Sequence, residues 1–213
     1  MGNLLSVDGA LIRILTKLGN LILLNVLWII GCIPLITIGT STTAFYYAVV
    51  KTVRRERSYP AKEFWQSYKK NLLRGSLVTL IFLAGTLLFY FNREYVAAIN
   101  HGTAITKVIV YDGLFIIAIA LLVCIFPVLS RFSLGLLRIW KLTFVMVIRF
   151  APYTILLVAG TLTIGYLQFR YLPIPLIFMI PALWCYAASF LIERMLKKYT
   201  PKPLEGEDAW YYE

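Results

Sequence analysis

The sequence predicts an all-α fold, a polytopic bundle of transmembrane helices, and three observations support this class. Of the 213 residues, 60% are hydrophobic and 15% are charged, whereas soluble domains are about 45–50% apolar and about 25% charged. The mean hydropathy is +0.78. The formal net charge is nevertheless +11. A chain that is both apolar and basic fits a bilayer, where lipid covers the apolar side chains and cations gather on the cytoplasmic side.

This composition excludes a soluble enzyme, a disulfide-stapled secreted domain and a disordered tail. We therefore predict one integral membrane domain over residues 1–213. The three cysteines, Cys32, Cys124 and Cys185, lie far apart in separate apolar runs. Redox and metal motifs need thiols at short spacing, so these cysteines are expected to pack as small hydrophobic residues.

Four apolar runs are long enough, with their flanks, to cross the hydrocarbon core, which takes about 20 helical residues. Arg149 is the only charge within the third run, and the fourth run carries no charge. The runs cover residues 77–91, 108–129, 142–167 and 171–192.

The region before these runs has two interpretations. Residues 18–50 carry no charge, and one helix of that length would reach about 50 Å, too long for a core of about 30 Å. Pro34 and Gly39 predict a break near the middle. Either one span over 18–38 precedes an interfacial helix, or two spans, near 11–33 and 35–53, turn at the break.

The distribution of basic residues along the chain favours one of these two interpretations. Eight cations lie within residues 51–74, against only Glu56 and Glu63. With two spans in the first region, seventeen cations fall on one side and three on the other, which makes the first side cytoplasmic. We predict six spans in the cell membrane with both termini in the cytoplasm, including the C-terminal tail over 193–213. Five spans, with the N-terminus outside, is the alternative.

The cytoplasmic basic loop over 51–74 ends in a predicted amphipathic helix. Its apolar residues recur at i, i+4 and i+8, and such a helix before a span lies on anionic headgroups. The second interpretation is a docking surface for a partner. The candidate contact residues are Phe64, Trp65, Tyr68, Lys69 and Leu72.

Five further residues are candidates for an intramembrane structural or functional role. Arg149 is the only cation within a run, and Pro152 frees backbone carbonyls that can accept its hydrogen bonds. The alternative for Arg149 is snorkelling toward the inner surface. The five candidates are Pro34, Gly39, Arg131, Arg149 and Pro152.

The sequence lacks the residues that common catalytic and cofactor sites need. It has no phosphate-binding loop, no H-E-x-x-H motif and no G-x-S-x-G elbow, and His101 is its single histidine. We therefore expect no enzyme activity, no cofactor and no metal site. Membrane orientation already explains the basic loop, so no nucleic-acid partner is expected.

Three sequence blocks carry a resemblance to a known family. The run LGNLILLNVLWIIGCIPLITIGTSTTAFYY at 18–47, FPVLSRF at 126–132 and RFAPY at 149–153 resemble, in order and spacing, the YesL-like family of bacterial integral membrane proteins, a domain of unknown function. Members are typically encoded beside carbohydrate ABC importers and sensor kinases in Gram-positive bacteria.

The resemblance implies a non-catalytic accessory component of sugar import or sugar sensing. Its partners would be the lipid bilayer and the permease subunits of an ABC importer, or another membrane protein. A small transporter or channel in its own right is the alternative. The lack of acidic residues at the middle of the spans argues against an ion-coupled transporter.

Overall fold

The computed structural model describes residues 9–99, 104–171 and 179–200, and within these ranges the chain is helical without strands. The all-α prediction is confirmed to that extent. The elements are α1 (Ala10–Gly31), a 3-10 turn η1 (Leu35–Thr37), α2 (Ile38–Ala48), a π-helical segment η2 (Val49–Arg54), α3 (Pro60–Ile99), α4 (Ala104–Arg131), α5 (Leu136–Arg149), α6 (Ala151–Tyr171) and α8 (Ile180–Lys197).

Three of these helices are long and apolar enough to cross a membrane, which is compatible with a multi-pass membrane protein. They provide the segments Leu11–Gly31, Pro60–Tyr95 and Ile109–Arg131, and the bent pair α5–α6 counts as a fourth if it forms one span. The prediction of six spans is not confirmed, because α2 has only 11 residues and α8 carries Glu193, Arg194 and Lys197. Part of the fourth predicted run (172–178), His101 and most of the predicted tail (201–213) fall outside the described residues.

The first apolar region breaks where the sequence predicts. Helix α1 ends at Gly31, and Pro34 immediately precedes η1. The Thr37 hydroxyl donates to the Gly31 carbonyl at 2.8 Å and closes the turn. Helix α2 then begins at Ile38 and packs against α3.

The predicted amphipathic helix and the first apolar run form one helix, α3, 40 residues and therefore about 60 Å long. The sequence predicted a separate amphipathic helix, and the structure corrects that expectation. No proline lies between Ala61 and Tyr95 to interrupt the backbone hydrogen bonds. Gly75 costs about 1 kcal/mol of helix propensity, and its close packing against Thr40 offsets this cost.

The third predicted run is divided into two helices, α5 and α6, bent by 98°. Pro152 is the second residue of α6, a position that proline tolerates, while its ring would clash with the carbonyl of residue 148 in a continuous helix, which favours a break here. Phe150 between the helices is non-helical, with φ −112° and ψ 35°. Arg149 is the last residue of α5 and is exposed, so the structure does not place it against the packed helices.

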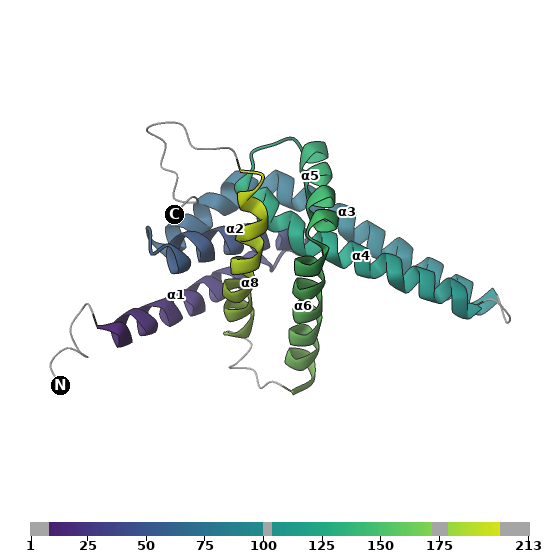
Figure 1. Ribbon diagram of the computed structural model, residues 1–213, viewed down its shortest axis with the longest axis horizontal. Helices are drawn as coiled ribbons and strands as arrows, with labels where there is room; N and C mark the ends of the chain where they lie inside the picture. The colour runs from purple at the N-terminus through teal and green to yellow at the C-terminus, as the bar shows by residue number, and fades with distance from the viewer. Residues whose placement is uncertain (1–8, 100–103, 172–178, 201–213) are drawn as a thin grey trace.

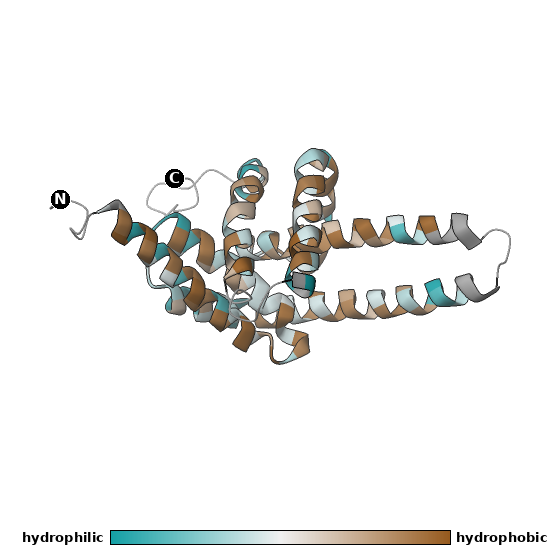
Figure 2. Cartoon of the chain, turned by 90° about the horizontal axis from the view of Figure 1, so that it is seen from below, coloured by the Kyte–Doolittle hydropathy of each residue, from teal (hydrophilic) through white to brown (hydrophobic). Residues whose placement is uncertain are grey.

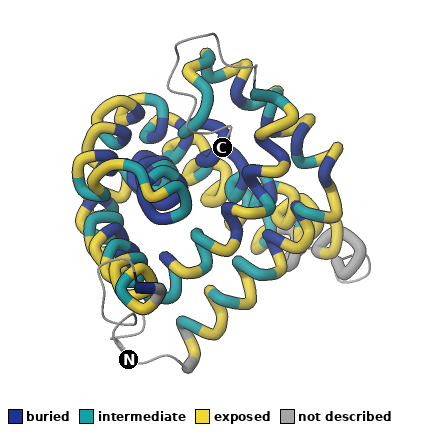
Figure 3. The backbone as a smooth tube through the Cα atoms, turned by 60° about the vertical axis from the view of Figure 1, so that its left-hand side comes forward, coloured by how far each residue is buried: buried dark blue, intermediate teal, exposed yellow. Residues whose placement is uncertain are grey.

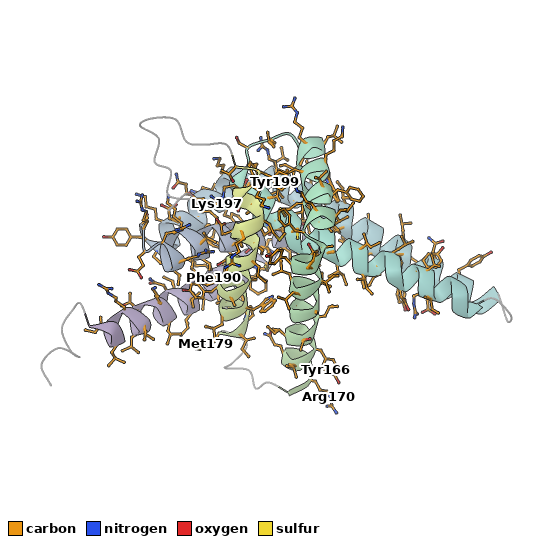
Figure 4. The ribbon with its side chains drawn as sticks, viewed as in Figure 1. Tyr166, Arg170, Met179, Phe190, Lys197 and Tyr199 are labelled. Atoms are coloured by element: carbon orange, nitrogen blue, oxygen red, sulfur yellow. The ribbon has the colours of Figure 1, made fainter. Side chains whose placement is uncertain are left out.

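The helices splay in different directions instead of forming a bundle of parallel rods. The hairpin of α3 and α4 extends to one side, while α6 and α8 run across that direction (Figure 1). Met179, Tyr166 and Arg170 lie at one end of the α6–α8 pair, and Lys197 and Tyr199 lie at the other (Figure 4). Hydrophobic residues continue along both helices of the hairpin far from the centre of the molecule (Figure 2).

Eight of the 11 residues of α2 are buried, and buried residues gather where the helices meet (Figure 3). Helix α2 contributes Phe45 to one apolar cluster with Leu24 of α1 and Phe64 of α3. It contributes Tyr46 to a second cluster with residues of α4, α5, α6 and α8. The other helices therefore meet through a short helix that is buried on both sides.

Candidate functional site

The five predicted contact residues of α3 lie on two different faces. Phe64 is fully buried. The centroid of its ring lies 5.6 Å from that of Trp65 and 6.0 Å from that of Tyr68. Tyr68 is half-buried and packs against the apolar cluster that contains Phe45, Leu24 and Phe64. Trp65 and Leu72 are 39% and 44% exposed, and Lys69 is exposed. Phe64 therefore belongs to the core, which corrects its place among the surface residues, and Trp65, Lys69 and Leu72 remain accessible.

Gly39, one of the five candidates for an intramembrane role, lies where α2 crosses α3. Its backbone N–H donates to the Thr79 hydroxyl at 2.9 Å, and Thr79 donates to the Gly75 carbonyl at 2.9 Å. A Cβ added to Gly75 would lie 2.6 Å from the Cα of Thr40. The two helices can approach this closely because glycine has no side chain at the contact.

Arg131 forms the most buried ion pair described. Its guanidinium lies 2.5 Å from the carboxylate of Glu193, and the two side chains are 7% and 8% exposed. The Tyr46 hydroxyl donates to the other oxygen of the same carboxylate at 2.8 Å. The group joins the end of α4 to α8 and α2. Glu193 is both charge-paired and hydrogen-bonded, and its partners come from two other helices, so the arrangement suits a structural role.

A second ion pair ties the start of α3 to η2. Lys51 Nζ lies 3.0 Å from Glu63 Oε2 and donates to the Tyr47 hydroxyl at 3.3 Å. Glu63 lies in the first turn of α3, where a negative charge also interacts favourably with the helix dipole. The two consecutive tyrosines of α2 thus reach the two buried carboxylates of α3 and α8.

Arg54 connects η2 to α8. It donates to the Ser189 carbonyl at 2.8 Å, and its guanidinium carbon lies 4.3 Å from the centroid of the Phe190 ring. Phe190 lies midway along α8 (Figure 4). Three of the cations that the sequence assigns to the cytoplasmic side, Lys51, Arg54 and Arg131, therefore hold helices together.

An exposed ion pair fixes the turn that follows η2. Lys17 Nζ of α1 lies 2.7 Å from Glu56 Oε1, and this bond lowers the pKa of the Glu56 carboxyl from its ordinary value of 4.5. Glu56 has φ 53°, a conformation that non-glycine residues seldom adopt. The ion pair therefore lies beside a strained turn.

A small polar hollow opens between α3, the end of α4 and the residues that follow it. Its volume is about 150 Å³, and its lining includes Ser67, Lys70, Asn71, Arg74, Arg131 and Ser133. From the sequence, Lys70 and Arg74 were used only as markers of orientation, whereas Arg131 was among the candidate residues. The signal that could have revealed the hollow is the i, i+4 spacing of Lys70 and Arg74 beside two buried polar residues.

A larger apolar groove, of about 540 Å³, lies between the α2–α3–α4 crossing and the α6–α8 pair. Its walls are mostly apolar and include the aromatic side chains of Trp28, Phe82, Phe126 and Trp184. Trp184 donates from its ring nitrogen to the Thr161 hydroxyl at 3.1 Å. Within the described residues, no group of three or more His, Cys, Asp or Glu side chains could hold a metal ion.

The fold and these sites define a helical protein with several segments able to span a membrane. Over residues 21–93 the chain is similar to the family described as "Protein of unknown function, DUF624". These residues run from α1 through the break and α2 into the outer part of α3. No curated protein and no solved structure matches the chain.

Proposed function

We propose that the chain is a non-catalytic accessory component of a bacterial carbohydrate ABC import or sugar-sensing system. In this proposal it lies in the cell membrane and binds permease subunits through its helices. The observation that carries the proposal is the exposed apolar surface on the outer half of the α3–α4 hairpin.

The hairpin is held together by contacts between its own two helices. The Phe89 ring stacks on Phe115 with centroids 5.1 Å apart, and Arg93 Nε lies 3.2 Å from Asp112 Oδ1. The outward faces are exposed: Phe91 is 66% exposed and Ile109 is 64% exposed. Only 11% of the most apolar window of α3 is buried within the chain.

Two glycines on this surface favour a partner helix over lipid alone. Gly85 and Gly113 are exposed, and no heavy atom lies within 4 Å of the Cβ that either would carry as alanine. In membranes, small residues allow the backbones of two helices to approach closely. Each glycine therefore provides a shallow notch into which a helix of another subunit can pack.

The proposal keeps six spans with a cytoplasmic C-terminus, and the exposed residues Trp65, Lys69 and Leu72 then face the cytoplasm. Its support is the distribution of cations in the sequence. In a background without the native cysteines, Asn3→Cys should resist an impermeant thiol reagent on intact cells. Lys107→Cys is the positive control, because position 107 lies outside the cell in both the six-span and the five-span topology. Labelling at position 3 would favour five spans.

Affinity purification after cross-linking in native membranes tests the partner. We expect permease and ATPase subunits of one importer to co-purify with the chain. The double variant Gly85→Leu/Gly113→Leu should reduce their recovery by about tenfold, because helix association in membranes involves about 1–2 kcal/mol per contact. Gly19→Leu/Gly135→Leu, which fills two equally open positions outside the hairpin, the groove and the hollow, is the matched control.

Three results would contradict the proposal in distinguishable ways. A chain that brings down neither permease nor ATPase is not an importer component. Equal recovery with both double variants would place the contact outside the hairpin. Sugar flux in proteoliposomes that contain this chain alone would favour the small transporter or channel.

A further inference from the structure

We propose that the polar hollow between α3 and the end of α4 binds a phosphate group at the membrane interface, supplied by an anionic phospholipid headgroup. The inference is independent of the proposed function, because it concerns a different surface and a different ligand. It rests on the charges, the donors and the position of the hollow.

The hollow carries positive charge that the described residues do not balance. Lys70 and Arg74 lie one turn apart on the same face of α3, and like charges at this spacing destabilise a helix. Neither side chain pairs with a carboxylate within the described part of the chain, and no carboxylate is among the residues that line the hollow. Arg131 also lines it, but Glu193 neutralises that charge.

The hollow is also built to present hydrogen-bond donors at fixed positions. Its wall includes Ser67 and Asn71, which are 4% and 5% exposed. The amide nitrogen of Asn71 donates to the Ser67 carbonyl at 3.1 Å and to the Ser67 hydroxyl oxygen at 3.4 Å, which fixes both side chains and leaves the hydroxyl proton of Ser67 as the donor for a ligand. Arg74 can bind two phosphate oxygens at once, and Lys70 adds a compact charge beside it. The exposed hydroxyl of Ser133 completes the rim.

The position of the hollow along the hairpin favours a lipid as the source of the phosphate. The face of α3 that carries Lys70 and Arg74 continues as Leu77 and Ile81, which are 38% and 52% exposed. On α4, the apolar stretch ends beside the hollow at Leu129. The hollow therefore lies where both helices change from apolar to charged, the level at which lipid headgroups meet the hydrocarbon core. Acyl chains can then lie along Leu77 and Ile81.

Titration of the purified chain with phosphatidylglycerol in a neutral detergent, followed by native mass spectrometry, tests this site. We expect Lys70→Gln/Arg74→Gln to weaken lipid binding by about tenfold or more, because it removes charged hydrogen bonds. Lys62→Gln/Arg138→Gln is the matched control, since it removes one lysine and one arginine that are exposed and outside the hollow. The control should bind as the unmodified chain does.

Each outcome has a defined meaning. Equal weakening by both double variants, or by neither, would overturn the site, because diffuse attraction to basic residues would then explain any binding. Inorganic phosphate that binds with the same dependence on Lys70 and Arg74 would support the phosphate site but overturn the lipid as its source.

Discussion

The two halves of α3 differ in how much of the helix is buried, although they belong to one uninterrupted helix. The inner half, before residue 80, buries Ser67, Asn71 and Gly75 against the other helices. The outer half leaves Leu87 and Leu88 more than half exposed. Burial in this chain is therefore set by which helices cross a segment and not by how apolar the segment is.

The two halves of α3 also make different kinds of contact with neighbouring helices. At the α2–α3 crossing, hydroxyl groups and glycines allow close contact, and the Thr40 hydroxyl donates to the Leu72 carbonyl at 3.0 Å. In the outer half, aromatic rings of α3 and α4 contact each other, and the remaining apolar side chains, such as Leu87 and Leu88, are exposed in the described part of the chain.

The largest expected difference between the halves concerns a buried ring and an exposed leucine. Phe64→Ala should lower the free energy of unfolding by about 3–5 kcal/mol, because it leaves a cavity among fully buried neighbours. Leu88→Ala should change it by less than about 1 kcal/mol, since Leu88 is 65% exposed. Denaturant unfolding in detergent measures both, and similar losses would show that the two halves do not differ in packing.

The second-largest expected difference is between the stability contributions of the ion pairs at the two ends of the hairpin. Arg131→Met leaves Glu193 buried without its partner and should cost about 3–5 kcal/mol, most of which the additional change Glu193→Met recovers. Arg93→Met removes a pair whose side chains are 39% and 53% exposed, so its cost should be below about 1 kcal/mol. Failure of the double variant to recover stability would mean that Arg131 acts through more than this pair.

A glycine in each half provides a smaller and cleaner contrast. Gly75→Ala should destabilise by about 1–3 kcal/mol, because the new methyl group would lie 2.6 Å from the backbone of Thr40. Gly85→Ala meets open space and should stabilise by roughly 0.5–1 kcal/mol through helix propensity. The sign of the change in melting temperature distinguishes them, and the same sign for both would contradict the close crossing.

The smallest expected effect depends on pH and concerns the exposed ion pair between Lys17 of α1 and Glu56, in the turn before α3. The pKa of Glu56 is lowered by Lys17, so the pair stabilises the folded chain above the ordinary pKa of 4.5. That contribution is lost as the pH falls through the lowered value. The melting temperature should therefore fall less in this window for Glu56→Gln than for the unmodified chain. Parallel pH curves would contradict this.

The apolar segments and the first break could be predicted from the sequence, because both depend on local composition. Residues 77–91 and 108–129 lie within α3 and α4, and the chain turns at Pro34 as expected. The 98° bend was missed although Pro152 was identified. Pro127 lies inside α4 without ending it, so a proline alone does not decide between a break and a continuous helix.

The buried ion pairs could not be predicted, because each joins residues distant in the chain. Arg131 and Glu193 are 62 positions apart, and only the crossing of α4 and α8 brings them together. Periodicity correctly placed Phe64 on the apolar face of its helix, but it could not show that α1 and α2 cover that face. The polar hollow likewise depends on residues from α3 and from the end of α4.

The unbroken course of α3 has a mechanical consequence. The helix crosses α2 at Gly75, with 15 residues, about 22 Å, on one side and 24 residues, about 36 Å, on the other. A small rotation about this crossing would move the two ends in opposite directions, and the far end of the hairpin would travel about 1.6 times as far as the cytoplasmic end predicted from the sequence. The longer arm of α3 carries the exposed apolar surface, so a partner bound there would act on the crossing over the longer distance.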